Sequence, residues 1–284
     1  MELEFFFVIT ARKSLFYAKK CLESIEAQLG SFSIQVLYVD DDSNYSRSQI
    51  TELSLWLKKI NGSLLLLSDR HYQIGALSKA IPLISNPYAV VCLMDGDDYL
   101  LHHALQTVSS LYQNQDTVMS YGNALVDFRP YQHPQSHYFS DKTSVNTPYP
   151  SQVWESGTFR EDGFRCFHLK TFRRWLWDYL NVQDFCRDDG TFFRASGDSA
   201  FIFPFLELLN HPKHVAFNED PIYVYRLHAG NVHNHDKKSQ SDDLNTLRFH
   251  REKYLPLDPA ILAYHIEQAS SYAMQEESHL IATR

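Results

Sequence analysis

The chain has 284 residues, of which 44% are hydrophobic and 14% aromatic, and it carries a formal net charge of -8. These values are typical of a folded globular protein and exclude a disordered one. The acidic balance argues against nucleic-acid binding, which needs clustered Lys and Arg. The length suits one large α/β domain or two modest ones with ample core.

The sequence predicts neither a membrane-spanning segment nor a secretion signal. Its apolar runs stay well below the roughly 18 to 20 residues of a membrane span, and the N-terminus Met-Glu-Leu-Glu lacks the basic start of a signal peptide. The four cysteines lie far apart and form no C-x-x-C pair, so neither a zinc site nor a disulfide framework is expected. We therefore predict a cytoplasmic protein and leave peripheral membrane association open.

The N-terminal part of the chain alternates short apolar runs with amphipathic stretches. The apolar runs predict strands over 5–10, 34–39, 63–67 and 89–94, and helical spacing predicts helices over 14–28, over 48–60 and up to residue 84. Ser14 is a candidate N-cap of the first helix, and Gly30 is a candidate for its end. This order is typical of a parallel sheet with right-handed crossovers.

Two of these predicted strands end in clusters of carboxylates. Asp40, Asp41 and Asp42 follow the second strand, and the sequence Asp-Gly-Asp-Asp at 95–98 follows the fourth. The carboxyl ends of parallel strands share one edge of a sheet, so both clusters are expected in one crevice. Crowded carboxylates repel one another, and a divalent cation with hard oxygen ligands would stabilise them. A solvated Asp-Gly turn is the alternative interpretation.

The order of four segments resembles a known family. VIT, then VDDDS, then Gly-x-x-x-Lys-Ala-Ile and finally MDGDD is similar to the nucleotide-sugar-binding half of family 2 glycosyltransferases, from Phe5 to about Asp127 and less tightly to about Asn231. The resemblance implies a GT-A fold, which is a Rossmann-like, mainly parallel sheet flanked by helices. It implies a GT-A domain over 1–240, with a nucleotide-sugar half at 1–127 and an acceptor and catalytic-base half at 128–240, followed by a helical tail at 241–284.

The resemblance also implies residues that bind the donor. Asp41 matches the aspartate of the DD-x-S motif that binds the base, usually uracil, whose N3 proton a carboxylate can accept. The other donor contacts that it implies are Thr10, Ala11, Arg12, Arg70, Gly75, Lys79, Asp95 and Gly96. The chain departs from the family pattern at Asp42, where Gly is usual, and at Lys79, where Asn is frequent. For Arg70 and Lys79 a plain surface position is an equal alternative.

The metal site and the base are implied in the same way. Asp97 would be a direct ligand of Mn²⁺ or Mg²⁺, and Asp95 would reach the ribose, the metal or a metal-bound water. His228, in a Tyr-Arg-x-His sequence, would be the third ligand or a diphosphate contact, although a lone His in a loop is ordinarily solvated. Asp198, at the start of an apolar helix that contains Pro204, would be the catalytic base, with a plain helix cap as the alternative.

The remaining segments are less regular. A helix is predicted from Leu101 to about Tyr112, a strand at 118–122, a long loop over 128–153 on the acceptor side, and a last strand from Glu219. Over 163–180 the spacing predicts a strand near Cys166 that turns into a helix carrying Phe172 and Trp175. The basic side chains of this segment are candidates for contact with diphosphate or acceptor, namely Arg165, His168 and Lys170.

The hypothesis from sequence is an inverting, metal-dependent glycosyltransferase. A nucleotide-sugar donor, a UDP-sugar, would give its sugar to a glycan, lipid-linked or protein acceptor by direct displacement, with Asp198 as base. A sugar-nucleotide nucleotidyltransferase is the rival enzyme, although residues 10–14 lack the glycine-rich loop that such enzymes place after the first strand. A non-catalytic protein that binds sugar nucleotides is the third alternative.

Overall fold

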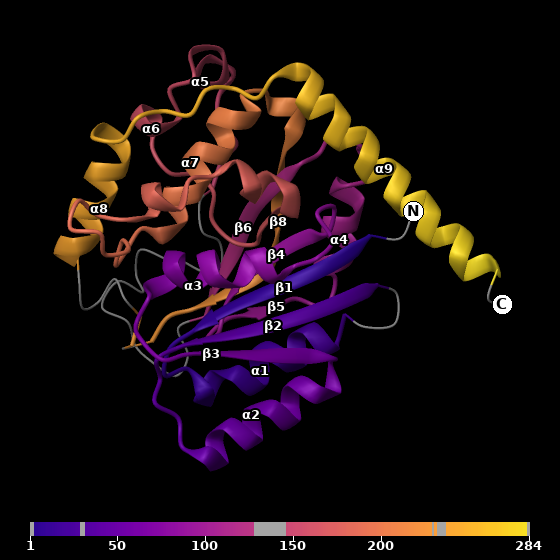
Figure 1. The fold of residues 1–284 in the computed structure, drawn as a ribbon, viewed down its shortest axis with the longest axis vertical. Helices are drawn as coiled ribbons and strands as arrows, with labels where there is room; N and C mark the ends of the chain where they lie inside the picture. The colour runs from indigo at the N-terminus through magenta and orange to yellow at the C-terminus, as the bar shows by residue number, and fades with distance from the viewer. Residues whose placement is uncertain (1–2, 29–31, 128–145, 229, 232–236, 283–284) are drawn as a thin grey trace.

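A twisted mixed sheet with helices on both faces forms the protein (Figure 1). The computed structural model describes residues 3–28, 32–127, 146–228, 230–231 and 237–282. Within them the sheet has eight strands in the order β3-β2-β1-β4-β7-β6-β8-β5. The strands are β1 (Glu4–Ala11), β2 (Ser33–Asp41), β3 (Gly62–Leu67), β4 (Val90–Asp95), β5 (Tyr99–Leu100), β6 (Met119–Asp127), β7 (Lys170–Arg173) and β8 (Val215–Arg226).

The helices connect these strands and cover the sheet. The α-helices are α1 (Leu15–Glu26), α2 (Arg47–Lys59), α3 (Tyr72–Ala80), α4 (Ala104–Leu111), α5 (Ser151–Ser156), α6 (Phe159–Asp162), α7 (Gly197–Leu209), α8 (Lys237–Phe249) and α9 (Pro259–Ala282). The 3-10 helices are η1 (Ile81–Leu83), η2 (Arg174–Tyr179), η3 (Val182–Phe185) and η4 (Pro212–His214). The predicted end of the first helix at Gly30 lies outside the described residues.

The parallel part of the sheet confirms the predicted βα pattern. Strand β1 pairs in parallel with β2 and β4, and β2 pairs in parallel with β3. Side chains alternate between two cores, as the period of two in a strand requires. Phe5 and Phe7 pack with α1, α2 and α4, whereas Val8 packs on the opposite face with α3 and α7. Figure 1 shows α1 and α2 on one side of β1–β3 and α3 and α7 on the other.

Strand β7 is the main departure from the predicted elements. It begins at Lys170, four residues after the predicted strand near Cys166, and it contains Phe172, which was expected in a helix. Residues 174–179 then form a 3-10 helix in place of the predicted α-helix. The backbone continues to pair beyond the strand, because the amide of Arg174 donates to the carbonyl of Ala89. Pairing with β4 therefore overrides the helical spacing of the aromatic residues.

Three further boundaries differ from the predictions. Strand β6 extends to Asp127, beyond the predicted end at residue 122, and β8 begins at Val215, before the predicted start at Glu219. The predicted loop over 128–153 falls on residues 128–145, which lie outside the described residues, and ends in α5, which begins at Ser151. The predicted helix with an internal proline is confirmed as α7.

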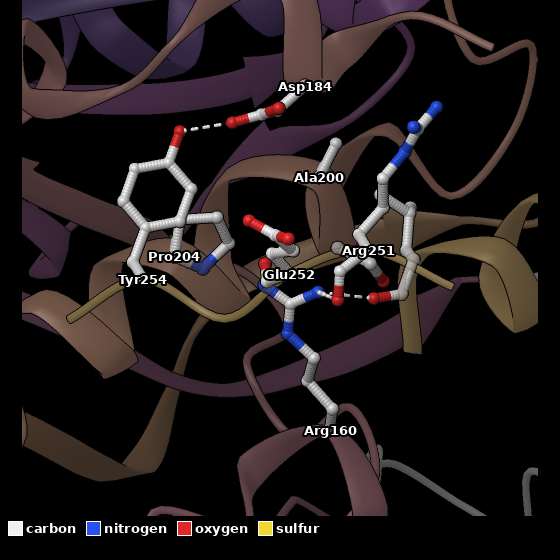
Figure 2. Close-up of a pocket in the computed structure, with 9 residues that line it drawn as sticks. Arg160, Asp184, Ala200, Pro204, Arg251, Glu252 and Tyr254 are labelled. Atoms are coloured by element: carbon white, nitrogen blue, oxygen red, sulfur yellow. Dashed lines mark hydrogen bonds between the residues drawn. The ribbon is translucent and has the colours of Figure 1, made fainter. Parts of the chain in front are cut away.

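A buried ion pair joins α6 to α7, and its arginine also binds the C-terminal segment. Arg160 and Glu207 are 2% and 4% exposed, and the Nε and Nη2 atoms of Arg160 donate to the Glu207 carboxylate at 2.6 and 2.8 Å. The remaining guanidinium hydrogens go to the backbone carbonyls of Leu247, Arg251 and Glu252 at 2.7, 3.2 and 3.2 Å. Figure 2 shows Arg160 beside Arg251 and Glu252, and these residues line a small hollow between α7 and the chain that follows α8. All five guanidinium donors therefore have acceptors.

The last helix, α9, packs on η2. The ring of His265 stacks on Trp175 with 4.2 Å between ring centroids and 3° between planes. The hydroxyl of Tyr179 lies 2.9 Å from His265 Nε2. None of the helices in the described part of the chain combines the length and the apolar character needed to cross a bilayer.

Candidate active site

The acidic turn after β4 lies against the end of β1. The amide of Gly96 donates to the carbonyl of Thr10 at 2.9 Å, and Thr10 pairs with Asp95 across the two strands. A Cβ atom on Gly96 would lie 2.6 Å from the Cβ of Ala11, closer than any two such atoms approach. Only glycine therefore allows the turn to sit this close to β1, and the structure brings together the predicted residues Thr10, Ala11, Asp95 and Gly96.

Asp97 and His228 form a direct contact beside this turn. The Nε2 atom of His228 lies 2.7 Å from Oδ2 of Asp97. The His228 ring also stacks on Tyr17 of α1, with centroids 4.5 Å apart and planes at 25°. Two residues that are 131 positions apart in the chain, and that were both predicted as metal ligands, thus face the same place.

The third aspartate of the turn, Asp98, has a different surrounding from the other two. It is fully buried, its Oδ2 accepts from the Tyr223 hydroxyl at 2.7 Å, and its Oδ1 accepts from the Arg226 amide at 2.7 Å. The Tyr223 hydroxyl in turn accepts from the Asp95 amide at 3.1 Å. Burial, and then the carboxylates of Asp97 and Asp95, raise the pKa of Asp98 well above its ordinary value. Asp98 thus joins the acidic turn to β8, a role that sequence did not predict.

Asp95 is the most perturbed carboxylate among those predicted to touch the donor. Burial, and next the charge of Asp97, raise its pKa to about 7. Gln73 at the start of α3 donates to its Oδ1 at 3.1 Å, and His168 Nε2 lies 3.7 Å from its Oδ2. A cation placed between Asp95 and Asp97 would favour the ionised form of both, so the electrostatics of the turn fit a divalent ion.

Two ligand sets for such an ion overlap in this site. Ligand atoms of Asp95, Asp98 and His168 lie within 4.8 Å of one another. The set predicted from sequence, Asp95, Asp97 and His228, contains the Asp97–His228 contact described above. In both sets carboxylate oxygens are joined by one imidazole nitrogen. Carboxylate oxygens suit Mg²⁺ and Mn²⁺, and a nitrogen ligand is more readily accepted by Mn²⁺.

Asp198 is connected to the acidic turn through two buried residues. It lies in the first turn of α7, and its Oδ2 accepts from the ammonium group of Lys170 at 2.8 Å. Lys170 Nζ lies 3.3 Å from Nδ1 of His168, which reaches toward Asp95. Oδ1 of Asp198 is buried and has no hydrogen-bond partner among the described residues. The carboxylate therefore faces Lys170 rather than the amides of its own helix.

Asp41 and its neighbours form the other end of the site. Both oxygens of Asp41 accept from the first amides of the α3 region, Oδ1 from His71 at 2.6 Å and Oδ2 from Tyr72 at 2.9 Å. Asp40 accepts from the amide of Ser43 at 3.0 Å. Each Asp41 oxygen keeps a lone pair for a further donor such as a base N–H.

The other residues predicted to contact the donor are not seen in contact with the acidic turn or with Asp41. Lys79 is exposed in the last turn of α3, whereas the first turn is the one next to Asp41. Arg70 is exposed, with its guanidinium carbon 4.3 Å from the centre of the Tyr72 ring. A Cβ on Gly75 would lie 2.6 Å from the Phe192 ring, so this glycine serves close packing. Arg12 is partly buried, and its Nε has no partner among the described residues.

The sequence matches a known protein family, and the fold matches solved structures. Residues 7–195 match the family described as Glycosyl transferase family 2. No curated protein sequence matches the chain. Among solved structures, a 1–349 fragment of TarS from S. aureus in complex with UDP-GlcNAc matches with a TM-score of 0.55 and 16% identity over 81% of this chain and 60% of that chain. This chain therefore spans less than two thirds of that fragment.

A second structure covers the whole chain. The mannosyltransferase PcManGT from Pyrobaculum calidifontis, in complex with GDP-Man and Mn²⁺, matches with a TM-score of 0.58 and 12% identity over 100% of this chain and 79% of that chain. At such identities these likenesses concern the fold, which is the predicted GT-A fold. The family match extends over more than half of the sequence, and the chain belongs to glycosyl transferase family 2.

Proposed function

We propose that the chain transfers a sugar from a nucleoside-diphosphate donor to an acceptor hydroxyl with inversion at the anomeric carbon. The observation that carries this proposal is the continuous path of contacts from Asp198 through Lys170 and His168 to Asp95. It joins a candidate base to the acidic turn where a diphosphate and its metal would lie. The solved structures similar in fold were obtained with UDP-GlcNAc and with GDP-Man and Mn²⁺, which supports a sugar-nucleotide donor.

On the donor side the acidic turn would hold the diphosphate. Asp95, Asp97 and His228 would bind Mn²⁺ or Mg²⁺, which when bound neutralises the charge of the departing diphosphate. Thr10, Ala11 and Gly96 bring backbone close to this place. Asp41 would accept the N3 proton of a uracil base, and this favours a UDP-sugar over donors whose base has no such proton.

On the acceptor side Asp198 would remove the proton of the attacking hydroxyl. A buried carboxylate oxygen without a partner is rare in proteins, and a ligand group is one explanation for it. The acceptor hydroxyl would donate to the Asp198 carboxylate, and its oxygen would form a bond to the anomeric carbon while the bond from that carbon to the diphosphate oxygen breaks. The proton remains on Asp198. Direct displacement from the opposite face inverts the anomeric configuration, by the reasoning used for inverting glycosidases.

The acceptor class and location remain predictions from sequence. A glycan, a lipid-linked saccharide or a protein could supply the hydroxyl, and a lipid-linked acceptor would bring the cytoplasmic protein predicted above to a membrane surface.

Release of nucleotide from UDP-sugars in the presence of Mn²⁺ tests the proposal without knowledge of the acceptor, because water can replace the acceptor hydroxyl. UDP should accumulate without added pyrophosphate or sugar phosphate, which separates this enzyme from a nucleotidyltransferase. The variant Asp198→Asn should bind UDP and Mn²⁺ as the wild type does and lose about 10²- to 10⁴-fold in turnover, the range expected for a general base. Equal turnover in the variant would refute Asp198 as the base.

A further inference from the structure

Lys170 is a charged side chain in the interior of the protein. Only 1% of its surface is exposed. It reaches the site because β7 runs antiparallel to β4, with Lys170 opposite Leu93. Two residues beyond this pair, toward the active-site edge, the strands lead to His168 and Asp95. An interior ammonium group is unfavourable unless it is paired and hydrogen-bonded, so its contacts define what it does.

The first contact of Lys170 is with the candidate base. Its Nζ lies 2.8 Å from Oδ2 of Asp198, and Asp198 keeps 22% of its side chain exposed. The ion pair fixes one carboxylate oxygen and leaves Oδ1 as the oxygen with no partner in the described chain. Rotation of the carboxylate would break the pair with Lys170 in the interior, and that makes other orientations unfavourable.

The second contact of Lys170 determines the state of His168. The distance from Nζ to His168 Nδ1 is 3.3 Å, and an ammonium group can only donate, so Nδ1 must accept. The ring lies flat against Tyr223, with centroids 4.5 Å apart and planes at 10°. A neutral ring that accepts at Nδ1 carries its proton on Nε2, the atom that faces Asp95 Oδ2.

A protonated Nε2 has no lone pair for a metal ion. In metal sites the ring nitrogen that does not bind the metal usually donates to a carbonyl or carboxylate, and Lys170 occupies the place of such an acceptor. The group of Asp95, Asp98 and His168 is therefore excluded as a ligand set in this tautomer, although its atoms lie close enough together. Nε2 of His168 instead lies 3.7 Å from the Asp95 carboxylate, which belongs to the turn that would hold the donor diphosphate in the proposed function.

We propose that Lys170 is a positioning residue of the transfer reaction, which orients Asp198 and holds His168 as a hydrogen-bond donor toward the donor side rather than as a metal ligand. The inference rests on the proposed function, since it assigns Lys170 a part in that reaction. It differs from the sequence-based hypothesis, in which Lys170 was a candidate for direct contact with diphosphate or acceptor.

Two variants of Lys170 test the first part of the proposal, that Lys170 orients Asp198. Lys170→Met keeps the length of the side chain and removes its charge, and Lys170→Arg keeps the charge. We expect Lys170→Met to lower kcat for UDP release by about 10²-fold, the effect of a misplaced catalytic group, with the KM for the donor little changed, and Lys170→Arg to recover part of kcat. Unchanged affinity for UDP and Mn²⁺ shows that each variant is folded. Lys213→Met, at an exposed lysine paired with Asp116 at 3.7 Å, is the matched control and should leave kcat unchanged.

A variant of His168 tests the second part of the proposal, that His168 does not bind the metal, by a measurement of binding affinity alone. His168→Gln keeps an amide hydrogen and removes the imidazole, and calorimetry with Mn²⁺ and UDP should give the wild-type affinity. A loss of metal affinity of tenfold or more would make His168 a metal ligand and overturn its role as a hydrogen-bond donor. A kcat of Lys170→Met equal to that of the wild type would overturn the role of Lys170 in orienting Asp198. If the wild type releases no UDP from any UDP-sugar, the proposed function fails, while the calorimetric result still decides the role of His168. If Lys170→Met does not fold, Lys170→Arg and Lys170→Gln are compared with the wild type in its place. An equal kcat in the wild type and in both of these variants refutes the positioning role.

Discussion

Replacing Arg160 by methionine should destabilise the protein strongly, although Arg160 lies outside the candidate active site. The variant leaves the carboxylate of Glu207 buried without its cation and removes the donors to three backbone carbonyls. Removal of one partner from a buried ion pair costs about 3–5 kcal/mol of unfolding free energy. The unfolding entropy of a 284-residue chain is about 0.6 kcal/mol/K at about 2.1 cal/mol/K per residue, so the Tm should fall by about 5–8 °C.

Thermal and urea unfolding followed by circular dichroism measure this effect. The double variant Arg160→Met with Glu207→Met should recover much of the loss, because a buried pair can often be replaced by apolar side chains of similar volume. Lys253→Met is the control, since Lys253 forms a half-exposed pair with Glu161 at 2.7 Å and should cost no more than about 1 kcal/mol. A loss in Arg160→Met as small as that of the control would refute the reasoning.

Four further predictions concern the acidic turn. Asp97→Asn should lower the affinity for Mn²⁺ with UDP at least tenfold, the scale of losing even an outer metal contact, while the Tm stays near that of the wild type; unchanged affinity in calorimetry would remove Asp97 from the metal site. The affinity for Mn²⁺ with UDP should rise between pH 6 and pH 8, because the pKa of Asp95 is about 7 and only its ionised form binds a cation; a flat profile would contradict this. In the metal-free protein the raised pKa of Asp95 should make the stability fall as the pH rises, which is opposite to its effect on metal affinity. Above the ordinary pKa of 3.8 the unfolded state has lost a proton that the folded state still holds. The contribution of Asp95 to the unfolding free energy should therefore decline from about pH 4 through about pH 7. Gly96→Ala should weaken UDP binding and cost about 1–3 kcal/mol of stability, because its methyl group would lie 2.6 Å from Ala11; wild-type Tm and affinity would show that the turn can move aside.

The parallel half of the sheet could be predicted from local patterns. Apolar runs mark β1, β2 and β4, and the carboxylates at the ends of β2 and β4 mark the edge where a site would form. The motif order was enough to predict the GT-A fold, which the comparisons support.

The connections within the site could not be predicted in the same way. Lys170 reaches Asp198 and His168 because β7 pairs antiparallel with β4, and such pairing leaves no local signal in a segment whose aromatic residues have helical spacing. The role of Asp98 depends on Tyr223 of β8, which is 125 positions away. Lys79 shows the reverse case, since it matches a motif position yet lies exposed at the far end of α3.

The two hydrogen bonds of Asp98 also bear on how the protein would capture its ligand. Because this buried side chain joins the turn after β4 to Tyr223 and Arg226 of β8, the strand ends that carry Asp97 and His228 are held in one rigid unit before anything binds. A set of ligand side chains held in place in this way loses little conformational entropy on binding. Any opening movement that admits the sugar nucleotide should therefore come from the surroundings of this unit, and the acidic turn should keep its shape throughout a catalytic cycle.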